Sequence, residues 1–175
     1  MRIEDTPRIQ NLLIAITFTI YIICGMAGAL IADRQIQFFT WDVSSLSLLV
    51  GSAIFGMKLE KKEYVTAAAG FTVLAIAEGV IYSELATSGN PDPISVASGM
   101  LLYIPSLILI GLFAPFTPAV RITGLVTSLI YIFIVVIVYT TGKMEYNHWL
   151  VNTGFILLNL TSAGWIFECY KMDKN

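Results

Sequence analysis

Long apolar stretches, separated by short groups of charged residues, form the main pattern of this chain. A helix that crosses a hydrocarbon layer of about 30 Å needs roughly 17 to 25 apolar residues, and five gaps between ionisable residues are long enough. A sixth gap, between Asp42 and Lys58, holds only 15 residues. We expect this helix to begin earlier, with the rings of Phe38, Phe39 and Trp41 among the lipid headgroups. Lys58 would then extend its amine to water at the other end.

The pattern therefore predicts an all-α, polytopic membrane protein. Residues 1–175 form one transmembrane domain, a compact bundle whose expected helices cover approximately residues 9–32, 38–58, 63–85, 94–114, 119–141 and 147–169. Composition leads to the same class, because 57% hydrophobic residues, 13% charged residues and a mean hydropathy of +0.78 lie outside the range of soluble globular chains. The net charge of −2 gives no reason to expect a nucleic-acid partner. The expected surroundings are the lipid bilayer.

The basic residues are distributed unevenly over the two sides that six helices define. One side, which holds both termini, collects Arg2, Arg8, Lys58, Lys61, Lys62, Arg121, Lys171 and Lys174, whereas the other has Arg34 and Lys143. Short loops rich in lysine and arginine stay in the cytoplasm. We therefore expect a protein of the plasma (inner) membrane with cytoplasmic N- and C-termini.

One carboxyl, that of Glu78, lies inside the third expected helix. A charged side chain at the centre of a membrane helix costs about 2.5 to 3.5 kcal/mol on insertion scales, so such acids are rare and face polar partners or water. Burial raises the pKa of a carboxyl group, and neighbouring hydrogen-bond donors lower it again. A carboxyl group on which both effects act can carry a proton or hold a cation. The alternative interpretation is structural: Glu78 hydrogen-bonds a neighbouring helix and holds the bundle together.

The sixth expected helix carries the most polar side chains. They recur at spacings of four, seven and three residues: His148, Asn152, Asn159 and Ser162. Such a stripe shares one face of a helix, and in lipid it turns toward the interior of the bundle. By depth, His148 and Asn152 lie near the level of Glu78, in the outer half of the bilayer. These positions predict a polar seam between the third and sixth helices.

Aromatic side chains are expected at two depths around the acid. Tyr82 and Trp41 lie in the outer half of the bilayer, and Tyr21, Tyr103 and Tyr131 lie nearer to mid-depth. Together with the polar stripe they predict an outward-facing cavity with aromatic walls and Glu78 at its base, suited to a small cationic or amphipathic ligand. Each tyrosine taken alone is better explained by core or interface packing. Only their convergence with the acid indicates a site.

We predict no metal, cofactor or catalytic residue. One histidine cannot build a bis-histidine haem site or a histidine zinc triad. No lysine lies inside an expected span as the anchor of a Schiff base, and the sequence holds no Gly-x-Ser-x-Gly, HExxH or P-loop pattern. We therefore expect a protein that is not an enzyme, with a membrane-embedded enzyme as the weakest alternative.

Two functions fit these patterns. The first is binding or transport of a small solute or proton, with Glu78 as the protonatable group. The second is a non-catalytic accessory or scaffold subunit of a larger membrane complex. Small residues along the first two expected helices suit close contact with another helix, and the partners would be other membrane subunits or a second copy of the chain.

Overall fold

The fold is taken from a computed structural model, which describes residues 6–87, 92–144 and 148–173. These ranges contain six α-helices: α1 (Thr6–Gly28), α2 (Arg34–Lys61), α3 (Val65–Thr87), α4 (Pro93–Phe113), α5 (Pro118–Thr141) and α6 (Trp149–Lys171). Each is long and apolar enough to cross a membrane. The prediction of an all-helical bundle with six such helices is confirmed. The second helix is longer than the predicted 38–58, with 28 residues.

Local sequence signals explain where several helices begin and end. Asp33 accepts hydrogen bonds from the first backbone N–H groups of α2, at 2.9 and 3.0 Å, which places the start of α2 before the aromatic residues. Asp92 caps α4 in the same way, directly before Pro93. His148 caps α6 by accepting from Leu150 N at 3.3 Å. Gly142 ends α5 with a φ of 65°, a left-handed conformation that glycine adopts without strain.

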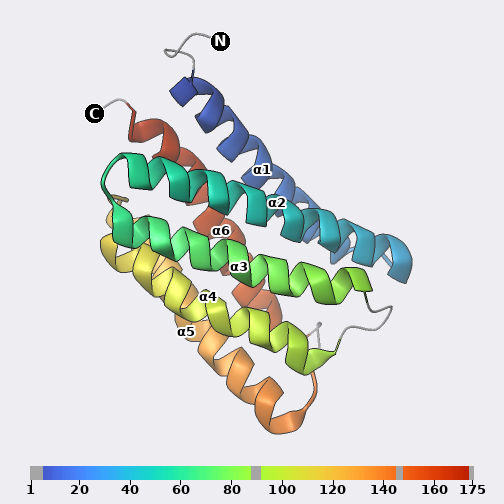
Figure 1. Ribbon diagram of the computed structural model, residues 1–175. Helices are drawn as coiled ribbons and strands as arrows, with labels where there is room; N and C mark the ends of the chain where they lie inside the picture. The colour runs from blue at the N-terminus through green and yellow to red at the C-terminus, as the bar shows by residue number, and fades with distance from the viewer. Residues whose placement is uncertain (1–5, 88–91, 145–147, 174–175) are drawn as a thin grey trace.

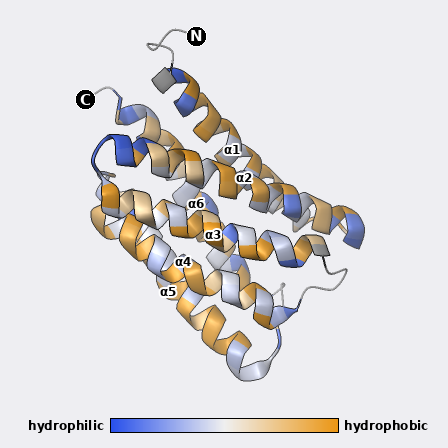
Figure 2. Cartoon of the chain, viewed as in Figure 1, coloured by the Kyte–Doolittle hydropathy of each residue, from blue (hydrophilic) through white to orange (hydrophobic). Residues whose placement is uncertain are grey.

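The six helices form a closed ring, which Figure 1 shows from one side. Each helix packs extensively against the next in the chain, and α6 packs against both α5 and α1. Consecutive helices run in opposite directions and their number is even. The start of α1 and the end of α6 therefore lie at the same end of the bundle, which we call the terminal end. In Figure 2 hydrophobic residues prevail along the helices, while hydrophilic residues gather at helix ends and at the turn between α2 and α3.

Five aromatic rings fill the centre of the bundle toward the terminal end. This aromatic cluster consists of Phe18, Phe55, Phe71, Phe116 and Trp165, which come from α1, α2, α3, the α4–α5 connection and α6. Their ring centroids are 4.7 to 6.3 Å apart in the contacting pairs. Because offset and edge-to-face rings attract one another beyond their buried area, this cluster joins four helices across the ring.

Small residues of α1 and α2 serve contacts inside the bundle. A Cβ atom at Gly28 would lie 2.5 Å from the indole ring of Trp41, and one at Gly51 would lie 2.7 Å from Thr17 Oγ1. These two glycines therefore let α1 and α2 approach closely. Two of the small residues that suggested contact with another subunit are thus used between neighbouring helices of the same chain.

Candidate functional site

Glu78 lies in the centre of the ring, with only 2% of its surface exposed. The hydroxyl of Tyr103 on α4 donates a hydrogen bond to Glu78 Oε1. Ser45 on α2 forms a second side-chain hydrogen bond with the same carboxyl group. The acid of α3 is thus held by its two neighbours in the ring. Two donors satisfy part of the strong demand of a buried carboxyl for hydrogen bonds.

Two further tyrosines complete the group around the acid. Tyr131 on α5 packs edge-to-face against Tyr103, with ring centroids 4.8 Å apart. The hydroxyls of Tyr131 and of Tyr21 on α1 lie close enough to Glu78 to be affected by its charge. We call Glu78, Ser45, Tyr103, Tyr131 and Tyr21 the Glu78 cluster. The structure therefore brings the three mid-depth tyrosines of the sequence analysis together with the acid.

The Glu78 cluster draws one residue from each of five consecutive helices. Each member lies at least seven residues from the nearest end of its helix, which is about 10 Å along a helix axis. All five side chains are buried. The cluster is therefore enclosed near the middle of the bundle, remote from both ends.

Two hydroxyls of the Glu78 cluster are unsatisfied. Within the described parts of the chain, the hydroxyls of Tyr21 and Tyr131 have no hydrogen-bond partner. Buried polar groups nearly always have a partner, in the protein or in ordered water. These hydroxyls can therefore take one or two small polar partners next to Glu78. A carboxyl with adjacent donors can accept a proton or exchange it with such a partner.

The outer-half residues that the sequence analysis placed beside Glu78 lie elsewhere. Asn152 is exposed, so its predicted inward orientation is wrong. The physical reason is the rotation of α6, because Asn152 lies two residues, or about 200°, from the buried Gly154. His148 is half-buried and serves as the cap of α6, with its ring beside Trp149.

Two aromatic residues of the outer half also have other positions. The half-buried Trp41 packs on Gly28 and Phe38, between α1 and α2. Tyr82 is half-buried, one turn beyond the acid on α3. Neither residue appears among the partners of the Glu78 carboxyl within the described parts of the chain.

The predicted polar seam between the third and sixth helices is also wrong. The rings of Phe71 and Trp165, 4.9 Å apart, join α3 and α6 across the bundle. Asn159 is half-buried and its Oδ1 has no partner among the described residues, while Ser162 is fully buried. Only the C-terminal part of the predicted stripe turns inward, because it lies beside the apolar face that carries Leu158 and Trp165.

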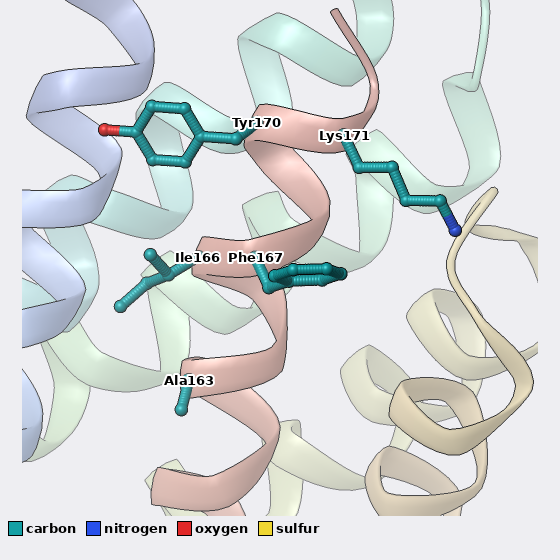
Figure 3. Close-up of a pocket in the computed structure, with 5 residues that line it drawn as sticks. All are labelled: Ala163, Ile166, Phe167, Tyr170 and Lys171. Atoms are coloured by element: carbon teal, nitrogen blue, oxygen red, sulfur yellow. The ribbon is translucent and has the colours of Figure 1, made fainter. Parts of the chain in front are cut away.

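Two open hollows on the surface of the described structure lie away from Glu78. One, of about 390 Å³, follows the outer face of α6 and is lined by Ala163, Ile166, Phe167, Tyr170 and Lys171. Figure 3 shows these side chains spread over both sides of one helix, with Tyr170 and Phe167 pointing apart. The other, also of about 390 Å³, lies between α2 and α3 and is lined by Gly56, Glu60, Ala68 and Thr72, among others. Neither is the predicted outward-facing cavity with the acid at its base.

A polar cluster at the terminal end escaped the sequence analysis. Lys58 is only 3% exposed and donates to Asn11 Oδ1, to Cys169 O at 2.7 Å and to Asp173 Oδ2 at 2.9 Å. Lys62 lies 3.2 Å from Asp173 Oδ1. The prediction that Lys58 extends to water is therefore wrong. Its ammonium turns inward because three acceptors from α1, α6 and the C-terminal turn replace the water that it loses. We call Asn11, Lys58, Lys62 and Asp173 the terminal cluster.

The charge of Asp173 is stabilised by this arrangement. Partial burial raises the pKa of the Asp173 carboxyl, but hydrogen bonds from Lys58, Asn11 and Lys62 outweigh it, and the pKa lies below its ordinary value of 3.8. A sequence signal did exist, because Lys58 and Asp173 carry opposite charges and lie at the ends of the second and sixth helices, which share one side of the bundle. Nothing in the sequence indicated that α1 would add Asn11 between them.

No known protein-family model, curated protein or solved structure matches this chain. Within residues 6–87, 92–144 and 148–173, no group of three histidine, cysteine or acidic side chains is placed to hold a metal ion. The interpretation of the site therefore depends on its geometry alone.

Proposed function

We propose that this protein is an integral membrane protein that binds or moves a proton or a small solute, with Glu78 as the protonatable group. The observation that carries the proposal is the convergence of five helices on one buried carboxyl through Ser45, Tyr21, Tyr103 and Tyr131. A purely structural acid needs partners on one neighbouring helix. A polar centre shared by five helices is costly in lipid and is typical of a proton or ion pathway.

The enclosed position of Glu78 favours a proton over a larger solute. Glu78 is 2% exposed, and it lines neither of the two surface hollows described above. A ligand much larger than water would have to separate the helices to reach the acid. A proton needs only a chain of hydrogen-bonding groups.

The membrane setting of the proposal follows from charge. Eight basic residues against two predict cytoplasmic termini and a plasma (inner) membrane location. The terminal end of the bundle, with Lys58 and Lys62, would then be the cytoplasmic end.

The test is proton flux into liposomes that contain the purified protein and a trapped pH-sensitive dye. After an external pH step from about 8 to about 6, the range in which a buried carboxyl exchanges protons, the wild type should acidify the lumen faster than empty vesicles. Glu78→Gln keeps the size of the side chain and one acceptor oxygen but cannot ionise, and it should reduce the flux to the level of empty vesicles. The matched control is Glu60→Gln, at an exposed acid of α2, which should leave the flux unchanged. Equal flux in Glu78→Gln and wild type would overturn the proposal.

A second candidate function is that of an accessory or scaffold subunit, and the hollow between α2 and α3 favours it. Small side chains line this groove, among them Gly56, Ala68 and Ala75, and such surfaces admit a second helix in lipid. Purification in mild detergent with light scattering distinguishes the two functions. A stable complex with other polypeptides favours the subunit, whereas an isolated monomer or homodimer with Glu78-dependent flux favours proton transfer.

A further inference from the structure

Three fully buried serines continue the polar interior from the Glu78 cluster toward the terminal end. Ser52 and Ser162 each lie nine residues before the ends of α2 and α6, and Ser106 lies seven residues before the end of α4. Each of the three is 0% exposed. At about 1.5 Å per residue they lie roughly 10 to 14 Å from the terminal end, while Glu78 lies roughly 20 Å from it. The serines therefore occupy one level, below the acid.

Two of these serines share a helix face with a member of the Glu78 cluster. Ser52 follows Ser45 by seven residues, which places both on nearly the same side of α2. Ser106 follows Tyr103 by three residues, one turn further along α4. Because Ser45 and Tyr103 point at the carboxyl of Glu78, Ser52 and Ser106 point into the same interior, closer to the terminal end.

The hydroxyls of Ser52, Ser106 and Ser162 have no hydrogen-bond partner among the described residues. This is not the general behaviour of hydroxyls in these helices. Ser47, for example, donates to Val43 O at 2.7 Å and Thr161 donates to Leu157 O at 2.7 Å, each one turn back in its own helix. A buried hydroxyl without a partner forfeits about 1 to 3 kcal/mol. Each of the three therefore calls for a small polar partner at this level.

The indole N–H of Trp165 extends the series. Trp165 is 0% exposed, lies three residues beyond Ser162 on α6, and its Nε1 also has no partner among the described residues. An indole nitrogen only donates, so its missing partner is an acceptor. The ring itself belongs to the aromatic cluster, where it contacts Phe18 and Phe71. The buried polar groups without described partners therefore extend as far as Trp165, where the aromatic cluster fills the centre of the bundle.

The half of the interior beyond Glu78, away from the terminal end, is largely apolar. Its buried side chains include Val96, Met100, Ile134, Val138, Leu150 and Val151. The described exceptions are Ser44, whose hydroxyl donates to Tyr21 O at 2.9 Å, and Asp42, one turn before Ser45, which is half-buried with an unpartnered Oδ1. The other ionisable groups near the acid are the tyrosines of its own cluster, and Lys58 and Glu168 lie beyond the aromatic cluster. Most of the described buried polar groups without a hydrogen-bond partner thus lie between Glu78 and the terminal end.

We propose that a file of ordered water molecules fills this interior from the Glu78 cluster to Trp165, bound by the hydroxyls of Ser52, Ser106 and Ser162. Water fits this series because it can accept from the indole and both donate to and accept from each serine. Its role rests on the proposed function: the file carries protons between Glu78 and the aromatic cluster, on the side of the terminal end. Each hydroxyl or water accepts one proton and releases another, so a proton moves along the file without leaving a charge on any member. The aromatic cluster is the barrier at the end of the file.

X-ray radiolytic labelling of the full-length protein in lipid nanodiscs tests the water file. Radiation converts bound water to hydroxyl radicals, which oxidise the side chains beside it, and mass spectrometry reports the rate for each residue. Trp165 should be oxidised despite its burial, and the triple variant Ser52→Ala, Ser106→Ala, Ser162→Ala should slow this oxidation about threefold or more because its waters lose their partners. Trp149, which is 68% exposed, is the internal reference.

The matched control is Ser47→Ala with Ser98→Ala, because both hydroxyls donate to carbonyls of their own helices. It should leave Trp165 oxidation unchanged. Ser162→Ala alone, one turn from Trp165, replaces the triple variant if that does not purify as a folded protein. Absent oxidation of Trp165 in the wild type, or the same rate in wild type and serine variant, would overturn the water file.

Proton flux in the same liposome assay separates this inference from the proposed function. If Glu78→Gln retains flux while Trp165 oxidation depends on the serines, the proposed function fails and the water file stands. If Glu78→Gln loses flux while Trp165 is not oxidised, the file fails and the proposed function stands. If the serine variant slows Trp165 oxidation but conducts protons at the wild-type rate, the file is not the route of the proton.

Discussion

Tyr103 of α4 donates a hydrogen bond to the carboxyl of Glu78 on α3, and both residues are buried in the centre of the bundle. The two helices are neighbours in the ring, and this bond gives their contact a polar centre within apolar surroundings. In a medium of low dielectric constant such a bond is strong, and leaving one partner unsatisfied is costly.

Removing the tyrosine hydroxyl should therefore destabilise the protein. Tyr103→Phe keeps the ring that packs on Tyr131 and removes one donor to the acid, with an expected loss of about 1 to 3 kcal/mol in the free energy of unfolding. Chemical unfolding in detergent measures this loss. Tyr170→Phe, at a tyrosine that is 42% exposed, is the control and should change stability by less than about 0.5 kcal/mol. Combining Tyr103→Phe with Glu78→Gln should cost less than the sum of the two changes, and strict additivity would contradict a direct coupling.

The terminal cluster should contribute stability that depends on pH. The pKa of Asp173 lies below its ordinary value of 3.8 in the folded protein, so its contribution is complete above that value and is lost as pH falls through the folded-state pKa. Asp173→Asn should lower the free energy of unfolding by about 2 kcal/mol near neutral pH, because Lys58 remains buried with fewer acceptors. At a pH below the folded-state pKa, the wild type and the variant should be equally stable. A difference that persists under acid would exclude the ionised pair as its cause.

Substitution of Gly99 should destabilise the protein, because α3 and α4 are in close contact there. A Cβ atom at Gly99 would lie 2.5 Å from Ile81 Cγ1 and 3.1 Å from the backbone oxygen of Ala77. Gly99→Ala should therefore force the two helices apart and cost about 1 to 3 kcal/mol. Gly79→Ala is the matched control, because its Cβ would meet only Leu49 Cδ1 at 3.5 Å. The control should be neutral or stabilising, and equal thermal stability of the two variants would contradict the packing of α3 on α4.

The predicted orientation can be tested by labelling cysteines in intact cells. Lys61 and Lys143 are exposed at opposite ends of the bundle. In a background with Cys24→Ala and Cys169→Ala, Lys143→Cys should react with a membrane-impermeant maleimide added outside the cells. Lys61→Cys should react only after the cells are permeabilised. The reverse result would contradict the orientation inferred from the basic residues.

The sequence by itself determined the six helices and the burial of one acid among them. A segment in lipid must satisfy its backbone hydrogen bonds internally, so a long apolar run between charges can only be a helix. This requirement is local, and it can be read from Val65 to Thr87 without knowing the neighbours of α3. The tyrosines of mid-depth could be placed near Glu78 for the same reason, because depth follows from position along a helix.

Only the tertiary structure decided which side chains meet. The partners of Glu78 depend on the order of the helices in the ring and on the rotation of each about its axis. Packing of Gly154 and Trp165 turned Asn152 away from the interior, and the fold of α1 against α2 brought Asn11 to Lys58. A sequence pattern gives the spacing of residues on one helix, whereas the contacts between helices result from side-chain volumes on two helices at once. For that reason the acid was predictable from the sequence, and its partners Ser45 and Tyr103 were settled only by the packing of α2, α3 and α4.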